Sequence, residues 1–237
     1  MKRALLGIAA LFAAALTVVA LAPAAWIGDW VEANSRFRLL DARGTVWNGS
    51  ALVGLSDGRQ TMLLPGRLSW ELKLAAASIE LSHPALAAPV ILTPRIGSLA
   101  VKAGQAEVPA AALSAIGAPF NTLRPGGRLV ATWTDAVVRT DGFSGGLEVE
   151  WRDAQSALST VVPLGTYRLR LTGETGRLEL ETVRGPLLLQ GSGTLKGRRV
   201  SFKGLASAEP EARPALAGLL GVLGPRMGDN ALLVLET

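Results

Sequence analysis

The segment 167–183 constrains the fold more than any other part of the chain. It reads Y-R-L-R-L-T, then G-E-T-G, then R-L-E-L-E-T-V, so apolar and polar residues alternate on both sides of a glycine-bounded loop. If G-E-T-G is the loop of an antiparallel pair, Leu169 lies opposite Leu180 on one face and Arg168 lies opposite Glu181 on the other. Both faces agree on one register, because leucine meets leucine and arginine meets glutamate. The segment therefore predicts a β-hairpin with one apolar face and one charged face.

Other segments carry the same alternation between glycines and prolines. With Gly197-Arg198 as a two-residue turn, Leu195 faces Val200 and Gly193 faces Phe202. Three more segments begin at a glycine and end on a tryptophan: Gly66 to Trp70, Gly127 to Trp133 and Gly146 to Trp151. Their uneven spacing favours tandem hairpins over a solenoid of fixed period. The pattern predicts a mainly β fold with one elongated, curved antiparallel sheet, open like half a barrel.

One or two short helices are expected within this β region. Residues 109–116 and 214–223 each begin with proline, which suits the first turn of a helix. The second of these segments is apolar, but it is too short to cross a bilayer. Neither helix is therefore expected to interrupt the β domain for long.

The N-terminal region predicts a membrane anchor. Lys2 and Arg3 precede an apolar run from Ala4 to Ala25, which is long enough as a helix to cross a hydrocarbon core of about 30 Å. A cleaved secretory signal is the alternative, because Ala20-Leu21-Ala22 has the small residues of a cleavage site. The run is long for a signal peptide and continues past that site, so the uncleaved anchor is favoured.

Charge and aromatic residues predict the topology of this anchor. The basic residues precede the helix and the first acids, Asp29 and Glu32, follow it, so the N-terminus is expected in the cytoplasm of a bacterium. Trp26 and Trp30 are expected at the membrane interface. The predicted division is residues 1–28 as cytoplasmic tip and inner-membrane anchor, and residues 29–237 as a periplasmic β domain.

Composition excludes several classes of protein. Of the 237 residues, 49% are hydrophobic, which is too many for a disordered chain. The chain has no cysteine, so neither a disulfide framework nor a thiolate metal site is available. The net charge of +5 comes from scattered arginines without basic runs, which argues against a nucleic-acid surface. Attraction to anionic lipid headgroups remains compatible with this charge.

The stretch R-G-T-V-W-N-G-S-A, residues 43–51, places a tryptophan directly before an Asn-Gly pair. Asn-Gly is a strong hairpin signal, so Asn48-Gly49 is predicted to form a turn, and Trp47 is predicted on the buried face of the first strand. The alternative is that the tryptophans of the chain line a groove for lipid or protein. The sequence Asn48-Gly49-Ser50 also matches a glycosylation sequon, a pattern that is frequent by chance.

Catalytic chemistry finds little support. His83 is the only histidine, and no acidic cluster or second histidine gives a metal spacing. Residues 142–146 match the G-x-S-x-G pattern of a serine hydrolase, but that fold needs a histidine after Ser144 and none follows. The carboxylates Glu148 and Glu150 are two residues apart, which places them on one strand face open to solvent. We therefore predict a non-enzymatic protein with no catalytic, cofactor-binding or metal-binding residues and no cofactor.

In their order along the chain, these features resemble protein N of the bacterial type II secretion system (the GspN family). The resemblance rests on an N-terminal helix and on five motifs: Gly44 to Gly49, Gly66 to Trp70, Trp151 to Ala154, Pro163 to Tyr167, and Gly185 to Gly191. No single motif is specific; their order carries the resemblance.

The resemblance implies a single-pass inner-membrane protein with a periplasmic β domain, an accessory part of the machine that exports folded proteins across the outer membrane. Its expected partners are other inner-membrane secretion subunits, bound through the helix and the sheet edges. It implies no catalytic residues. The alternative function is a lipid-handling protein resembling the AsmA type, with acyl chains along the apolar sheet face; a hydrolase built on Ser144 is a more distant alternative.

Overall fold

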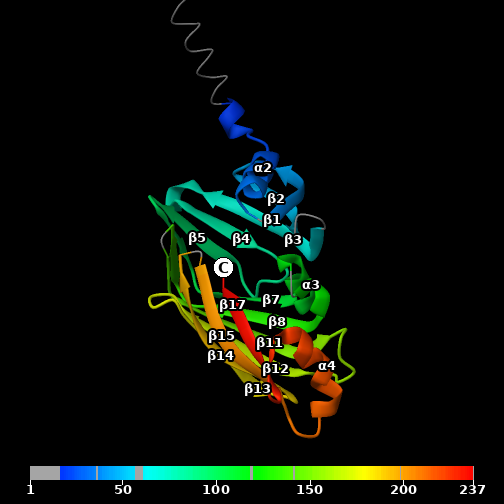
Figure 1. Ribbon diagram of the computed structural model, residues 1–237. Coiled ribbons are helices and arrows are strands. Elements are labelled where there is room, and N and C mark those ends of the chain that lie inside the picture. The colour runs from blue at the N-terminus through cyan, green and yellow to red at the C-terminus, as the bar shows by residue number, and fades with distance from the viewer. Residues whose placement is uncertain are drawn as a thin grey trace, which may run out of the picture.

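The computed structural model describes residues 17–35, 37–56, 61–117, 120–140, 142–197 and 199–236. Within these residues, antiparallel strands form an eight-stranded sheet and a nine-stranded sheet, and short helices lie beside them. Figure 1 shows the two sheets following one another along a curved molecule, with α2 at one end of the first sheet. The prediction of a mainly β fold is confirmed.

The first sheet contains the N-terminal strands. In spatial order they are β1 (Phe37–Gly44), β2 (Asn48–Ser56), β3 (Thr61–Lys73), β4 (Ser78–Ser82), β5 (Val90–Arg95), β6 (Ser98–Val101), β9 (Ala136–Arg139) and β10 (Phe143–Ser144). The second sheet contains, in the same sense, β16 (Arg226–Met227), β17 (Asn230–Glu236), β15 (Arg199–Ala208), β14 (Leu187–Lys196), β13 (Arg177–Arg184), β12 (Gly165–Thr172), β11 (Gly146–Ser156), β8 (Pro125–Trp133) and β7 (Gly104–Pro109).

Helices occupy the ends and one side of these sheets. They are α2 (Ala25–Asn34), α3 (Phe120–Leu123), α4 (Arg213–Leu223) and the 3₁₀ helices η1 (Leu74–Ala76) and η2 (Ala110–Ile116). The two predicted helices are therefore present, as η2 and α4. The sequence did not predict α3 or η1, both of which are no longer than a single turn.

The predicted hairpin registers are confirmed. β12 and β13 pair Leu169 with Leu180 and Arg168 with Glu181. β14 and β15 pair Leu195 with Val200 and Gly193 with Phe202. The three strands predicted to run from a glycine to a tryptophan lie within β3, β8 and β11. Agreement of side chains on both faces of a strand pair was therefore enough to set the register.

The single sheet predicted from the sequence is divided in two by a kink. β6 pairs with β9 in the first sheet, whereas their continuations β7 and β8 pair in the second. At the break, the Asp135 carboxylate accepts hydrogen bonds from the Ala103 N–H and the Lys102 ammonium, both at 2.8 Å, and the Trp133 indole donates to the Lys102 carbonyl at 2.8 Å. The prediction of one elongated sheet was therefore wrong: the strands form two sheets, and at the break these side-chain bonds take the place of ladder bonds.

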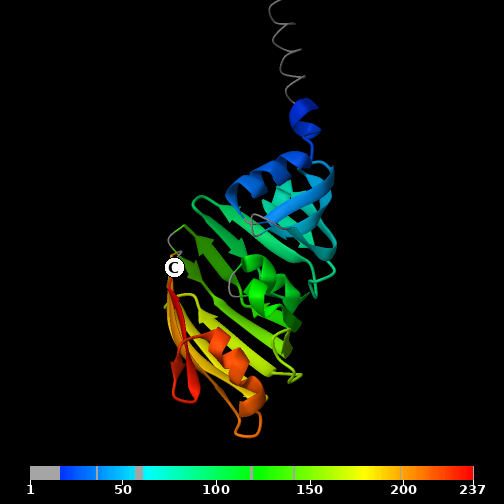
Figure 2. The ribbon, with the colours of Figure 1, turned by 45° about the vertical axis from the view of Figure 1, so that its right-hand side comes forward.

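Two apolar clusters hold the sheets. The smaller surrounds Trp70 in the first sheet, with Ala24 and Ala51 fully enclosed beside it. The larger lies between α4 and the second sheet and includes Tyr167 and Leu216. Figure 2 shows α4 lying across this sheet. Each sheet therefore has a core of its own.

The N-terminal segment bends before it reaches the sheets. Residues 17–20 are helical, residues 21–24 are not, and α2 then packs against β1. Gly28 allows this contact, since a Cβ there would lie 3.3 Å from the Leu39 carbonyl oxygen. Trp26 and Trp30 face outward, with 55% and 68% of their surface exposed. Among the described residues no helix is long and apolar enough to span a membrane, and most of the predicted anchor, residues 1–16, lies outside them.

Candidate functional site: an N-terminal clamp and a charged sheet face

The Asn-Gly pair after Trp47 is not a turn. Residues 45–47 make the connection between β1 and β2, while Asn48 and Gly49 already belong to β2. The Thr45 hydroxyl accepts a hydrogen bond from the Asn48 N–H at 3.1 Å. This bond closes the connection at residues 45–47, before the predicted turn at Asn48-Gly49. Trp47 therefore lies half-buried in the connection, and the prediction that it marks the buried face of the first strand was wrong.

Trp47 instead holds the N-terminal segment. Its indole N–H donates to the Val19 carbonyl at 2.8 Å, the Val46 N–H donates to the Ala22 carbonyl at 2.9 Å, and the Ala24 N–H donates to the Gly44 carbonyl at 3.1 Å. Pro23 and Thr45 form an antiparallel bridge between these bonds. We call residues 19–24 with residues 44–47 the N-terminal clamp.

The clamp rests on Trp70. This side chain is only 5% exposed, and its indole N–H lies 3.1 Å from the Val46 carbonyl oxygen. Its ring covers Gly49, where a Cβ would lie 2.5 Å from the ring and 2.8 Å from the Thr45 carbonyl oxygen. Gly49 is therefore required by the close approach of a tryptophan from β3, and the Gly44–Gly49 and Gly66–Trp70 motifs meet in one structural unit.

The other three motifs that carry the resemblance meet in the second sheet. The Tyr167 hydroxyl lies 3.0 Å from the carbonyl oxygens of both Leu164 and Leu187. The Trp151 ring packs edge-on against Tyr167, with 5.9 Å between centroids. Burial raises the pKa of Tyr167 well above its ordinary value, so its hydroxyl stays protonated. The motifs around Trp151, Pro163 and Gly185 therefore form a packing unit. Their role in packing explains these motifs without a catalytic role.

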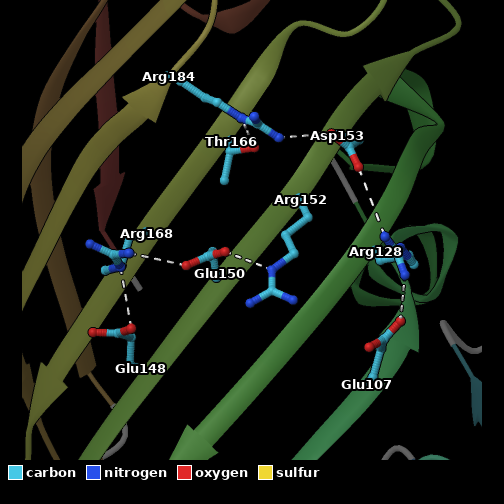
Figure 3. Close-up of polar contacts among 9 residues, drawn as sticks. All are labelled: Glu107, Arg128, Glu148, Glu150, Arg152, Asp153, Thr166, Arg168 and Arg184. Atoms are coloured by element: carbon cyan, nitrogen blue, oxygen red, sulfur yellow. Dashed lines mark hydrogen bonds and ion pairs between the residues drawn. The ribbon is translucent and has the colours of Figure 1, made fainter.

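The opposite face of the second sheet carries a network of arginines and carboxylates, drawn in Figure 3. Arg168 contacts Glu148 at 3.2 Å, Glu150 at 3.1 Å and Glu181 at 3.3 Å. Arg152 contacts Glu150 at 2.6 Å. We call this the charged face; it continues toward β7 and β13 through Glu107, Arg128, Asp153 and Arg184.

The charged face is electrostatically matched. The guanidinium of Arg152, followed by that of Arg168, holds the pKa of Glu150 below its ordinary value. A carboxyl group that acts as a general acid needs a raised pKa, so the lowered pKa of Glu150 does not suit that role. Glu148 and Glu150 lie on one strand face, as predicted; the Glu148 side chain is 42% exposed, whereas arginines leave that of Glu150 only 19% exposed.

Two arginines form ion pairs with aspartates on other strands, and both aspartates have an unusual backbone conformation. Asp41 in β1 and Asp153 in β11 both have φ of 49°, each at a register shift of its strand. Arg67 contacts Asp41 at 2.7 Å, and Arg128 contacts Asp153 at 3.9 Å. Sequence reasoning missed these bulges. The available signal was that Asp-Ala and Gly-Arg-Leu both occur twice in the strands concerned, as Asp41-Ala42 with Gly66-Arg67-Leu68 and as Asp153-Ala154 with Gly127-Arg128-Leu129.

The residues considered for catalysis do not assemble. Ser144 lies in the β9–β10 hairpin, with its hydroxyl 3.5 Å from the Val137 carbonyl oxygen. His83 lies after β4, where its Nδ1 accepts the Ala85 N–H at 3.0 Å and its Nε2 is buried without a partner in the described ranges. Burial lowers the pKa of His83. Across those ranges no group of three metal-ligating side chains occurs.

Comparison with known proteins identifies the family. The family model described as type II secretion system protein N matches residues 35–234, which include both sheets apart from the end of β17. Neither the curated proteins nor the solved structures gave a significant match. Because this match covers most of the chain, the chain belongs to the type II secretion system protein N family.

Proposed function

We propose that this chain is a non-enzymatic accessory component of the type II secretion system, anchored in the bacterial inner membrane and carrying a periplasmic β domain. In this role it binds other inner-membrane subunits and supports the export of folded proteins across the outer membrane. Family membership supports the assignment to the type II secretion system. The N-terminal clamp supports the proposed membrane anchoring. The clamp is the observation that carries the proposal, because it joins the apolar N-terminal segment to the β domain through backbone hydrogen bonds.

The clamp also bears on the alternative of a cleaved signal. The carbonyl of Ala22 accepts the Val46 N–H, and Ala22 is only 6% exposed. A peptidase needs this segment extended, whereas the hydrogen bond at Ala22 fixes its end against the first sheet, although Leu21 is 66% exposed. The intact mass of the purified protein should therefore include residues 1–22; a mass that begins at Pro23 would refute the anchor.

Cysteine labelling tests the topology, because the chain has no cysteine of its own. Thr140 lies exposed at the β9–β10 connection, and Lys2 precedes the apolar run. In intact spheroplasts, a membrane-impermeant maleimide should label Thr140→Cys at once and Lys2→Cys only after lysis. Equal labelling of both variants before lysis would contradict the proposed orientation.

A second candidate, the binding of lipid, is favoured by one observation. The face of the second sheet opposite the charged face carries leucines that are only half-buried, including Leu169 and Leu171 in β12. Acyl chains would complete the burial of such a surface. Native mass spectrometry of the solubilised protein separates the candidates: lipid retained after annular lipid is stripped favours lipid handling, and a bare protein excludes it.

A further inference from the structure

The sheets have four outer edges among the described residues, and three are covered by other parts of the chain. The β1 edge is bonded to residues 22–24 at its Gly44 end, and α2 packs against the strand, with Gly28 close to the Leu39 carbonyl. The β7 edge receives the loop after β4, where the Ala87 N–H donates to the Gln105 carbonyl at 3.0 Å. The loop after β12 lies against the β10 edge: the Gly173 N–H donates to the carbonyl of Gly145, directly after β10, at 2.8 Å, and a Cβ at Gly173 would lie 2.6 Å from the Phe143 carbonyl oxygen.

The fourth edge is open along β17. β16 covers only its start, pairing Met227 with Asn230 and Arg226 with Ala231. Figure 2 shows β17, in red, at the border of the second sheet. The Leu232 N–H points outward, since it donates to the Pro225 carbonyl at 2.9 Å. By the alternation of an antiparallel ladder, the N–H and C=O groups of Val234 and Glu236 also point away from β15.

The composition of β17 is that of a strand covered on all sides. Residues 231–235 read A-L-L-V-L, a continuous apolar run typical of strands buried on both faces. Yet Val234 and Leu235 are 51% and 49% exposed. This edge lacks the proline, lysine or bulge that usually blocks pairing with another chain. The strand is therefore built to be paired.

Charge indicates what pairs with it. Lys203 lies opposite Val234 in the ladder, and Lys196 and Arg199 lie opposite each other at the end of the neighbouring hairpin. Within the described ranges these three cations form no ion pair, whereas the arginines of the charged face are matched by carboxylates. An incoming strand would lie beyond β17, about 10 Å from β15, a gap that the long side chains of lysine and glutamate span across Val234, so acidic residues on this face would complete the pattern.

We propose that the outer edge of β17 is a strand-addition site for an extended segment of another secretion subunit, apolar on one face and acidic on the other. The proposal deepens and rests on the proposed function, since it names the surface by which the chain joins its partners. Backbone hydrogen bonds to Val234 and Glu236 would supply affinity, and Lys203 would select acidic side chains.

Proline at two adjacent positions tests the site. Val234→Pro removes an outward N–H and leaves the ladder to β15 intact, so it should lower recovery of secretion subunits with the tagged full-length chain about tenfold without changing its melting temperature. Val234→Thr keeps the N–H and the β-branched shape, so it should bind as the wild type does. Leu235→Pro removes an inward N–H and should destabilise the domain itself.

Charge reversal gives a second, independent variant. Lys203→Glu leaves the backbone unchanged and should weaken recovery of the same subunits in a salt-dependent manner. If the wild type recovers secretion subunits and both Val234→Pro and Lys203→Glu do so equally well, the edge site is refuted while the proposed function stands. If the wild type recovers none, the proposed function itself fails. A photo-crosslinker at Glu236 that joins two copies of this chain would refute the assignment to another subunit.

Discussion

Four tryptophans each fasten two backbone segments through the indole N–H. The acceptors are the carbonyls of Val19 for Trp47, Val46 for Trp70, Lys102 for Trp133 and Gly126 for Trp151. A tryptophan combines a large apolar ring with one donor, so it can cover a strand and fix the end of its neighbour at once. The recurring tryptophans of this chain are therefore explained by packing and backbone hydrogen bonding.

At Gly49, the ring of Trp70 leaves no room for a side chain. We predict that Gly49→Ala lowers the free energy of unfolding by about 1–3 kcal/mol, because the new methyl group would overlap the ring and a backbone carbonyl. The control is Gly221→Ala in α4, where nothing lies within 4 Å of the new Cβ, and which should be neutral or stabilising. Urea denaturation measures the free energy of unfolding of both variants. Equal values would show that the close approach of Trp70 to Gly49 does not make a side chain at Gly49 destabilising.

His83 gives a residue-level pH dependence. Burial lowers its pKa from the ordinary 6.5, so protonation favours the unfolded chain. Its contribution is present above the ordinary pKa and is lost as the pH falls toward the folded value. The urea midpoint should therefore drop between about pH 7.5 and pH 5.5. His83→Gln should drop less over the same interval, and an identical drop would remove His83 as the cause.

At the level of elements, the kink between the sheets decides the architecture. β6 continues into β7 and β8 continues into β9, so the same strands serve both sheets. Asp135 and Trp133 hold the two breaks side by side. Lys102, followed by the Ala103 N–H, lowers the pKa of Asp135, which keeps the carboxylate ionised as an acceptor. The joint is thus a fixed bend supported by defined hydrogen bonds.

We predict that Trp133→Phe destabilises the protein by about 0.5–1.5 kcal/mol, because the Lys102 carbonyl loses its donor while most of the ring contact remains. The matched control is Trp26→Phe on the exposed face of α2, which should change stability by less than about 0.5 kcal/mol. Thermal unfolding of both variants measures the difference. Equal losses would mean that the indole bond does not support the kink.

Strand pairs could be predicted from the sequence where the side-chain pattern and the loop residues indicated the same register. For the hairpin of β12 and β13, both faces and the loop gave one register, and the structure has it. At Asn48-Gly49 the local turn signal was strong but misleading, because Trp70 arrives from a different strand and needs the glycine for close approach. Asp135 could not be recognised as a kink residue, since its acceptor role depends on Ala103, thirty-two positions earlier.

At the scale of the whole molecule, the N-terminal clamp and the open β17 edge lie in different sheets. One joins the β domain to the segment that precedes it, and the other offers backbone groups to a partner. The charged face between them is internally matched, so it stiffens the second sheet without demanding a ligand. The proposed role as an anchored accessory subunit requires a fixed attachment, a stiff body and a free edge.

The clamp predicts the behaviour of the N-terminal segment. Trp47→Phe removes the bond to Val19, so amide exchange of residues 19–24 should accelerate by about 3- to 10-fold while the melting temperature of the β domain is unchanged. Hydrogen-exchange mass spectrometry of the full chain measures this. Trp26→Phe, which leaves the clamp intact, should not change the exchange. Unchanged exchange in Trp47→Phe would show that the segment is held by other contacts.

The most direct test of the central claim is in-cell photo-crosslinking of the full-length chain from positions beside Trp47 and Trp151, followed by identification of the captured molecules by mass spectrometry. If the chain is an assembly component, the captured molecules will be inner-membrane subunits of the type II secretion system. Capture of phospholipid or lipopolysaccharide without any secretion subunit would contradict this account and assign the apolar sheet face to lipid.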